Sequence, residues 1–308
     1  MTSTPVVPQH VLDRYFSKAN YTDQDRGIVE RAFITYADDV TKTIARHDDV
    51  RRKNKVMPVG RAATIVAGPG GAGKSVLMQS FNDLLCIDYE RALKRFPEIQ
   101  QLTQYFEGFA AGSDAMQEAS TKWLLGSKHN ADVMLNTLVG KGRPVAFETT
   151  GHGEGMAEFI ANLKANGYTV SMALCDTPTA VRDAALFNHY RAENGTYVDP
   201  VVNKSKVSGI RSNMEMFAKS VCCLDIYWRD DADKPLTLIA RSDKNGQITI
   251  VDQDGVNSFN ANSVLIKHGT YETLEAMLDH HSDVRRAATM RAEAEAKTGM
   301  LGGRIRII

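Results

Sequence analysis

Apolar and polar residues follow two different periods along the middle of the chain. Uninterrupted apolar runs rich in β-branched residues occur at 61–67, 143–147 and 168–175, and each predicts a buried strand. Stretches with helical periodicity occur at 154–166 and at about 178–193. Because strands and helices alternate, the pattern predicts an α/β fold with a mainly parallel sheet flanked by helices.

Helical periodicity also dominates both ends of the chain. Residues 8 to about 55 predict an N-terminal helical extension, and residues 271–298 predict a C-terminal helix. Between 236 and 251, two β-rich runs flank Asn245-Gly246, which is a strong hairpin signal. We therefore expect three parts: the helical extension (1–58), an α/β core (59–270), and a C-terminal helix with a tail that could be a short strand or disordered (271–308).

The strand at 61–67 leads into the most specific motif of the chain. Two glycines five residues apart, followed by Lys and Ser, form the phosphate-binding loop pattern. The run is Gly68-Pro69-Gly70-Gly71-Ala72-Gly73-Lys74-Ser75, and we expect every residue of it except the proline to bind the nucleotide. Glycines let the backbone turn tightly enough to aim several N–H groups at one phosphate. The motif predicts a P-loop kinase site for ATP (or GTP), with Lys74 on the phosphates and Ser75 ligating Mg²⁺.

Ligands of open α/β sheets bind at the carboxyl ends of the strands, so residues just after strands are the next candidates. Asp88 and Glu90 follow a short predicted strand, and either could deprotonate a hydroxyl that accepts a phosphoryl group. Each could instead be a charge at a helix N-terminus or on the surface. The run 148–152 offers a carboxylate, two hydroxyls and an imidazole to a sugar or another polyol. Helix capping by Thr149 or Thr150 is the alternative for this run.

Basic residues between 182 and 211 are candidates for the cation that faces the transferring group. In many kinases a basic lid covers the phosphates and excludes water. Most Lys and Arg in such a segment are solvated surface charges, so we expect one or two of these five to act: Arg182, Arg191, Lys204, Lys206 and Arg211. His129 and His152 are weaker candidates, since each is more often a polar surface residue.

The composition limits the classes of partner. Lys plus Arg equals Asp plus Glu, 37 each, so no global basic field favours nucleic acid. No apolar run approaches the length of a membrane span, and the N-terminus lacks the regions of a signal peptide. The four cysteines show no metal-ligand spacing, which is typical of free thiols in a reducing compartment. We expect a cytoplasmic protein that binds neither nucleic acid nor membrane.

Together these motifs resemble the zeta toxin family, the kinases of zeta-type toxin–antitoxin systems, over about residues 60–265. The loop is similar to the family's Gly-Pro-Gly-(Ser/Ala)-Gly-Lys-(Thr/Ser). Ile87 to Glu90 resembles its Ile-Asp-x-Asp stretch, and Phe147 to His152 resembles its Ile-Glu-Gly-Thr-Gly-Arg. Residues 194–200 resemble a Gly-rich segment before a Pro that opens a lid helix, and 225–230 resemble a strand that ends in a turn containing Asp or Asn.

The resemblance implies an ATP-dependent kinase that phosphorylates the sugar 3′-hydroxyl of UDP-N-acetylglucosamine. It implies catalytic roles for Lys74, Asp88 and Glu90, with Glu90 at the position of the family's catalytic Asp. The family's first lid arginine falls near His189, and Arg191, two residues later, is the catalytic cation that we expect. Substrate contacts are expected at the following positions: Asp132, Glu148, Thr150, His152 and His189.

This sequence also departs from the family. Glu90 is one methylene longer than the family's Asp, His152 stands where the family has Arg, and the lid arginines do not match cleanly. The changes lie at the acceptor end, so a second hypothesis is a kinase of another acceptor, such as a ribose hydroxyl of NAD. A third is a nucleotide-binding switch without an acceptor. In the family an antitoxin helix obstructs the nucleotide site, so residues 1–58 could inhibit within the chain, or could simply brace the sheet.

Overall fold

A computed structural model describes most of the chain. The described residues are 5–54, 60–81, 84–105, 114–153, 155–192, 200–231, 233–266 and 270–302. A seven-stranded sheet forms the centre, with strand order β2-β3-β1-β4-β5-β6-β7. Its strands are β1 (Ala62–Ala67), β2 (Leu85–Ile87), β3 (Val145–Thr149), β4 (Thr169–Asp176), β5 (Cys223–Trp228), β6 (Thr237–Ser242) and β7 (Ile248–Ile250).

The first five strands in the sheet order are parallel, and the last two pairings are antiparallel. Ile65 of β1 lies opposite Phe147 of β3 on one side and Met172 of β4 on the other. The hairpin predicted around Asn245-Gly246 joins β6 to β7, and Gly246 has a φ of 76° in its turn. The mainly parallel α/β sheet predicted from the sequence is therefore confirmed.

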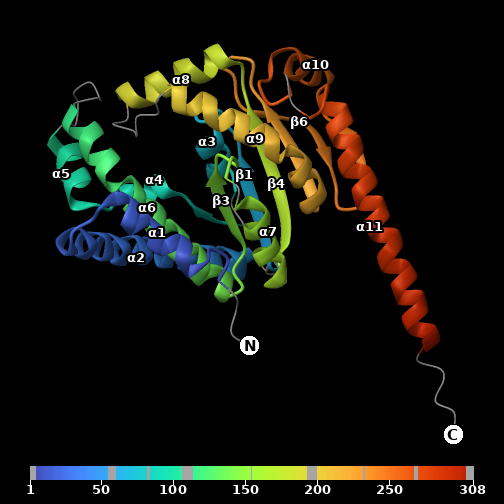
Figure 1. The fold of residues 1–308 in the computed structure, drawn as a ribbon, viewed down its shortest axis with the longest axis horizontal. Coiled ribbons are helices and arrows are strands. Elements are labelled where there is room, and N and C mark those ends of the chain that lie inside the picture. The colour runs from blue at the N-terminus through green and yellow to red at the C-terminus, as the bar shows by residue number, and fades with distance from the viewer. Residues whose placement is uncertain are drawn as a thin grey trace, which may run out of the picture.

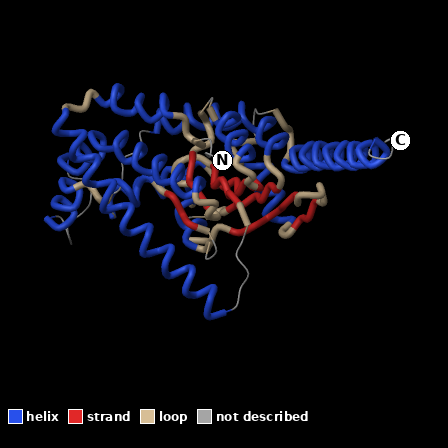
Figure 2. Tube along the Cα trace, turned by 90° about the horizontal axis from the view of Figure 1, so that it is seen from below, coloured by secondary structure: helices blue, strands red, loops and turns tan. Residues whose placement is uncertain are grey.

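Helices surround this sheet (Figure 1; Figure 2). In the described residues they are α1 (Gln9–Ala19), α2 (Asp23–Asn54), α3 (Lys74–Gln79), α4 (Tyr89–Leu93), α5 (Pro97–Tyr105), α6 (Asp114–Gly140), α7 (Met156–Ala165), α8 (Thr179–Ala192), α9 (Pro200–Ser220), α10 (Gln253–Asn262) and α11 (Leu274–Gly302). The helix α9 does begin at Pro200, as the resemblance implied. The short helix α10 was not predicted, and the tail at 304–308, expected to be a short strand or disordered, lies outside the described residues.

The N-terminal helices are part of the packed body. Tyr36 and Val40 of α2 belong to the main apolar cluster, which also holds strand residues such as Ile65. A second cluster joins Val29 of α2 to Trp123 of α6, whose side chain is 1% exposed. In Figure 1 both α1 and α2 lie beside α6, while α11 extends away from the sheet. None of the described helices combines the length and apolar composition needed to cross a membrane.

Candidate active site

The phosphate-binding loop connects β1 to α3 and has a backbone that requires glycine. Gly71 has a φ of 81°, in the left-handed region that favours glycine. A Cβ atom on Gly68 would lie 2.1 Å from the Cys175 carbonyl oxygen of β4, and one on Gly71 would lie 2.6 Å from the Arg182 carbonyl oxygen. The glycines predicted from the motif therefore provide both the turn and the room that the neighbouring backbone needs.

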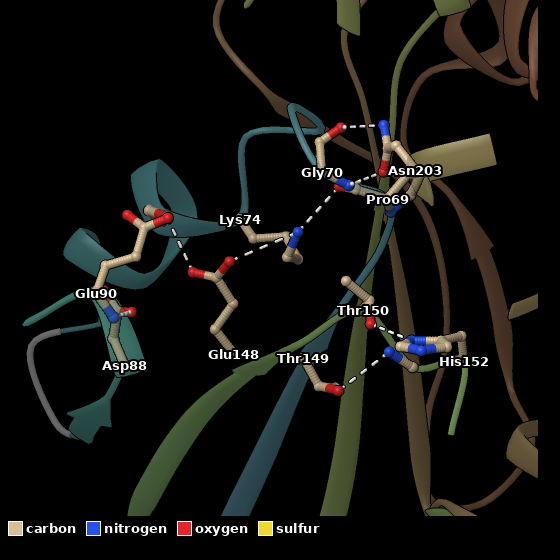
Figure 3. Close-up of polar contacts among 12 residues, drawn as sticks. Pro69, Gly70, Lys74, Asp88, Glu90, Glu148, Thr149, Thr150, His152 and Asn203 are labelled. Carbon is tan, nitrogen blue, oxygen red and sulfur yellow. Dashed lines mark hydrogen bonds and ion pairs between the residues drawn. The ribbon is translucent and has the colours of Figure 1, made fainter. Parts of the chain in front are cut away.

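Lys74 and Ser75 both contact one carboxylate from the adjacent strand, and Figure 3 shows the Lys74 contact. The Ser75 hydroxyl donates to Glu148 Oε2 at 2.9 Å, and Lys74 Nζ lies 3.5 Å from Glu148 Oε1. Lys74 is only 5% exposed and also donates to the Pro69 carbonyl at 2.9 Å. The resemblance implied that Glu148 contacts the substrate. In the structure it contacts the two loop residues that were predicted to bind phosphate and metal.

The donor set of this cluster fits Mg²⁺. Mg²⁺ in phosphoryl-transfer sites is bound by one or two protein oxygens together with phosphates and water, and P-loop proteins use the loop Ser and a carboxylate. The Ser75 hydroxyl and the Glu148 carboxylate supply this pair. Within the described residues no group of three His, Cys, Asp or Glu side chains could hold a metal by itself. The site therefore suits an ion that enters with a nucleotide.

Asp88 and Glu90 lie where β2 leads into α4. Asp88 is the N-cap of α4 and accepts a hydrogen bond from the Glu90 N–H at 2.7 Å, so it is also a helix N-terminal charge. Burial raises the pKa of Asp88 to about 7, and the negative charges of Glu148 and Glu90 add to this effect. A carboxyl group with a pKa near neutrality can exchange a proton at physiological pH.

The loop after β3 lies on the other side of Lys74 in Figure 3. Thr150 Oγ1 contacts His152 Nδ1, and burial together with Lys206 and Lys128 lowers the pKa of His152. Thr149 Oγ1 accepts from the Gly151 N–H at 3.0 Å. The alternative that these threonines cap the next helix is wrong, because the N-cap of α7 is Gly155 and has no side-chain cap.

Asp132 lies on α6 and is held by the N-terminal extension. The Tyr15 hydroxyl of α1 donates to Asp132 Oδ2 at 2.8 Å. Burial raises the pKa of Asp132 to about 6, although this hydrogen bond and the charge of Lys128 act in the opposite direction. The Lys128 ammonium in turn lies 5.5 Å from the ring centroid of Tyr89, between the two candidate bases. Lys128 is thus near both Asp132 and Tyr89, the residue between Asp88 and Glu90 in the sequence.

The candidate lid cations fall in different environments. Arg182 is 5% exposed and donates weakly to Thr179 Oγ1 at 3.4 Å. Lys204 is exposed and Lys206 is half-buried, while Arg211 donates to the Val264 carbonyl. His189 and Arg191 lie in α8, but their side chains are outside the described residues.

Sequence reasoning missed two residues that touch the loop. Asn203 of α9 accepts from the Gly70 N–H at 3.0 Å and donates to the Gly70 carbonyl at 3.3 Å. Arg229, just after β5, donates to the Gly71 carbonyl at 3.3 Å. The position of Arg229 after a parallel strand was the available signal, whereas nothing local marks Asn203. A cavity of about 340 Å³, lined by residues such as Ser171, Asp225 and Arg241, includes none of the predicted site residues.

Comparisons with known proteins bear on the fold. No protein-family model and no curated protein matches the chain. A chain in the structure of AvrRxo1-ORF1:AvrRxo1-ORF2 with sulphate ions is 14% identical, with 92% of this chain and 96% of that chain covered and a TM-score of 0.50. A chain from the PezAT chromosomal toxin-antitoxin system of Streptococcus pneumoniae is 16% identical, with coverages of 86% and 96% and a TM-score of 0.49. At these identities, the AvrRxo1 likeness shows a shared fold.

Proposed function

We propose that this protein is an ATP-dependent kinase, similar to zeta toxins, that phosphorylates a hydroxyl of a nucleotide-linked metabolite. The observation that carries the proposal is the convergence of Lys74 and Ser75 on Glu148, beside an Asp88 whose pKa is about 7. These are a phosphate cation, a metal ligand pair and a base, the parts that phosphoryl transfer to a hydroxyl requires. The fold shared with the AvrRxo1 structure is consistent with this.

Each residue of the candidate site has a defined task in this proposal. Bound ATP would supply the phosphoryl group, and Mg²⁺ would supply charge between its phosphates. Lys74 would exchange the Pro69 carbonyl for phosphate oxygens, and Ser75 and Glu148 would hold the ion. Asp88 takes the proton of the acceptor hydroxyl, because its pKa of about 7 suits a base at neutral pH. Glu90 is the alternative base.

UDP-N-acetylglucosamine is the first acceptor to test, through the sugar 3′-hydroxyl. We propose that Asp132, Thr150 and His152 bind this acceptor, and that His189 and Arg191 complete the lid. Glu148, which the resemblance placed on the acceptor, is assigned to the ion instead, because it contacts Lys74 and Ser75. Two observations are consistent with this assignment: Lys128 lies near both Asp132 and Tyr89, the neighbour of Asp88 and Glu90 in the sequence, and Thr150 contacts His152.

We also propose a brace role for residues 1–58, a kinase core at 59–270, and a C-terminal helix and tail at 271–308. The brace is favoured because Tyr36 and Val40 pack in the main cluster and Tyr15 holds Asp132. Inhibition of the nucleotide site by this segment would need contacts with the loop. In the described part of the chain, the side chains that hydrogen-bond the glycines of the loop are those of Asn203 and Arg229. We further propose that a separate antitoxin regulates the enzyme and that it acts in the cytoplasm.

The test is direct. Purified protein is incubated with ATP, Mg²⁺ and a panel of UDP-sugars and dinucleotides, and each acceptor is examined by mass spectrometry for one added phosphate. The Lys74→Ala protein is the control, since it retains the loop glycines. A Lys74-dependent phosphorylated UDP-N-acetylglucosamine supports the proposal. A phosphorylated dinucleotide would replace the acceptor and keep the kinase, whereas ADP without any phosphorylated acceptor would favour a nucleotide-binding switch.

A further inference from the structure

One face of α9 connects the phosphate-binding loop to the loop after β3. Asn203, Lys206, Gly209 and Asn213 are spaced by three or four residues, so they share that face. Asn203 holds both backbone groups of Gly70. Asn213 donates to the carbonyls of Gly151 and Gly153, at 2.9 and 3.2 Å. The helix is therefore tied to the loop at one end of this face and to residues 151–153 at the other.

Lys206 lies between these two points of attachment. Gly209, one turn further, packs so closely on His152 that a Cβ atom there would lie 2.8 Å from His152 Cβ. Lys206 is half-buried and within electrostatic range of Lys74, Lys128 and His152. Burial lowers the pKa of Lys206, and the charge of Lys74 lowers it further. Like charges gathered beside a phosphate-binding loop repel one another until an anion lies between them.

The other described cations of the lid segment point to different partners. Lys204 is exposed, although it is only two residues away on the same helix. Arg211 is engaged by the Val264 carbonyl. Arg182 belongs to α8 and packs against Gly71 of the loop, with one guanidinium nitrogen 3.4 Å from Thr179 Oγ1 and another 3.7 Å from Asp183. Lys206 is thus the described lid cation that α9 holds between Lys74 and His152.

We propose that Lys206 is a catalytic residue that contacts the γ-phosphoryl group as it passes from ATP to the acceptor. The inference rests on the proposed kinase function. A bond forms between the acceptor oxygen and the γ-phosphorus, the bond from that phosphorus to the β-phosphate oxygen breaks, and the hydroxyl proton goes to Asp88. Lys206 forms no covalent bond and donates hydrogen bonds to the group in transfer, a task that Arg or Lys performs in other kinases.

The experiment compares the affinities of ATP and ADP, because ADP lacks the group that Lys206 contacts. Dissociation constants of MgATP and MgADP are measured by calorimetry for wild type, Lys206→Met and Lys204→Met. A charge-assisted hydrogen bond predicts that Lys206→Met weakens MgATP binding by about 10- to 100-fold. MgADP binding should stay within about twofold of wild type, Lys204→Met should match wild type for both ligands, and Lys206→Arg should recover most of the loss.

Several results would overturn the inference. Lys206→Met could bind MgATP as wild type does, or could lose MgATP and MgADP equally while keeping the wild-type urea midpoint. Neither result contradicts the kinase proposal, because wild type still binds ATP and the acceptor assay tests that proposal separately. If wild type binds neither nucleotide, the kinase proposal and the role of Lys206 fail together. If Lys206→Met lowers the urea midpoint, the comparison moves to Lys206→Gln, which is shorter than Lys but removes the charge and keeps a polar group.

Discussion

Asp88→Asn tests whether a partly buried carboxyl group beside Glu90 and Glu148 carries the proton that the proposed reaction needs. The amide is the same size and can keep the N-cap bond to the Glu90 N–H, so the change removes the charge alone. The folded pKa of Asp88 is about 7, against an ordinary value of 3.8. Since the folded pKa is raised, the contribution of Asp88 to stability is full below about pH 4. It is lost as the pH rises to 7.

The size of the effect follows from these two pKa values. Linkage predicts that the raised pKa of Asp88 lowers the free energy of unfolding, relative to its value at low pH, by about 1.7 kcal/mol at pH 5 and about 4 kcal/mol at pH 8. The difference in unfolding free energy between Asp88→Asn and wild type should therefore grow by about 2 to 3 kcal/mol between these pH values, in favour of the variant. Urea titrations at pH 5 and 8 measure it. The comparison with wild type cancels the contributions that other buried carboxyl groups make to the pH dependence of stability. One such group is Asp176, whose pKa is raised to about 6 by burial.

Asp252→Asn is the matched control, because Asp252 is the N-cap of α10 and is exposed. It reports what an amide does at an N-cap in this protein. If the stability difference between Asp88→Asn and wild type is the same at pH 5 and 8, the buried carboxyl cluster does not exist as described. The same variant tests the base: kcat should fall by about 100-fold or more if Asp88 takes the proton, and should be retained if Glu90 does.

Three further changes address the packing around the site. Gly209→Ala should lower the free energy of unfolding by about 1 kcal/mol in urea titrations, despite the better helix propensity of Ala, because the new methyl group meets His152; a gain would show that α9 can move aside. Tyr15→Phe should lower the free energy of unfolding by about 1 kcal/mol and raise the pKa of Asp132 in a ¹³C NMR titration, because it removes a hydrogen bond to that carboxylate. It should also raise the KM of the acceptor more than that of ATP. An unchanged Asp132 titration would contradict this reasoning. Deletion of residues 1–55 should give aggregated protein in size-exclusion chromatography, since it exposes the apolar face of α6, whereas soluble protein with increased toxicity would favour an inhibitory segment.

Local constraints explain what the sequence predicted well. The loop from Gly68 to Ser75 needs left-handed glycines and close approach of the backbone, and few other sequences meet both needs. The parallel strands were visible as apolar β-branched runs, because buried strands exclude polar residues. The hairpin at Asn245-Gly246 could also be predicted locally, because its turn has a left-handed residue and therefore selects Gly. The roles of His189 and Arg191 stay predictions.

The sequence by itself determined the phosphate-binding loop, the α/β alternation and the candidate carboxylates that follow strands, because these depend on backbone geometry within a few residues. Only the tertiary structure decided which distant side chains meet there. Glu148 reaches Lys74 and Ser75 because β3 pairs with β1, an order that no local pattern specifies. Lys206 is turned inward and Lys204 outward because Asn203 and Gly209 set the rotation of α9, and that rotation follows from packing between segments far apart in the chain.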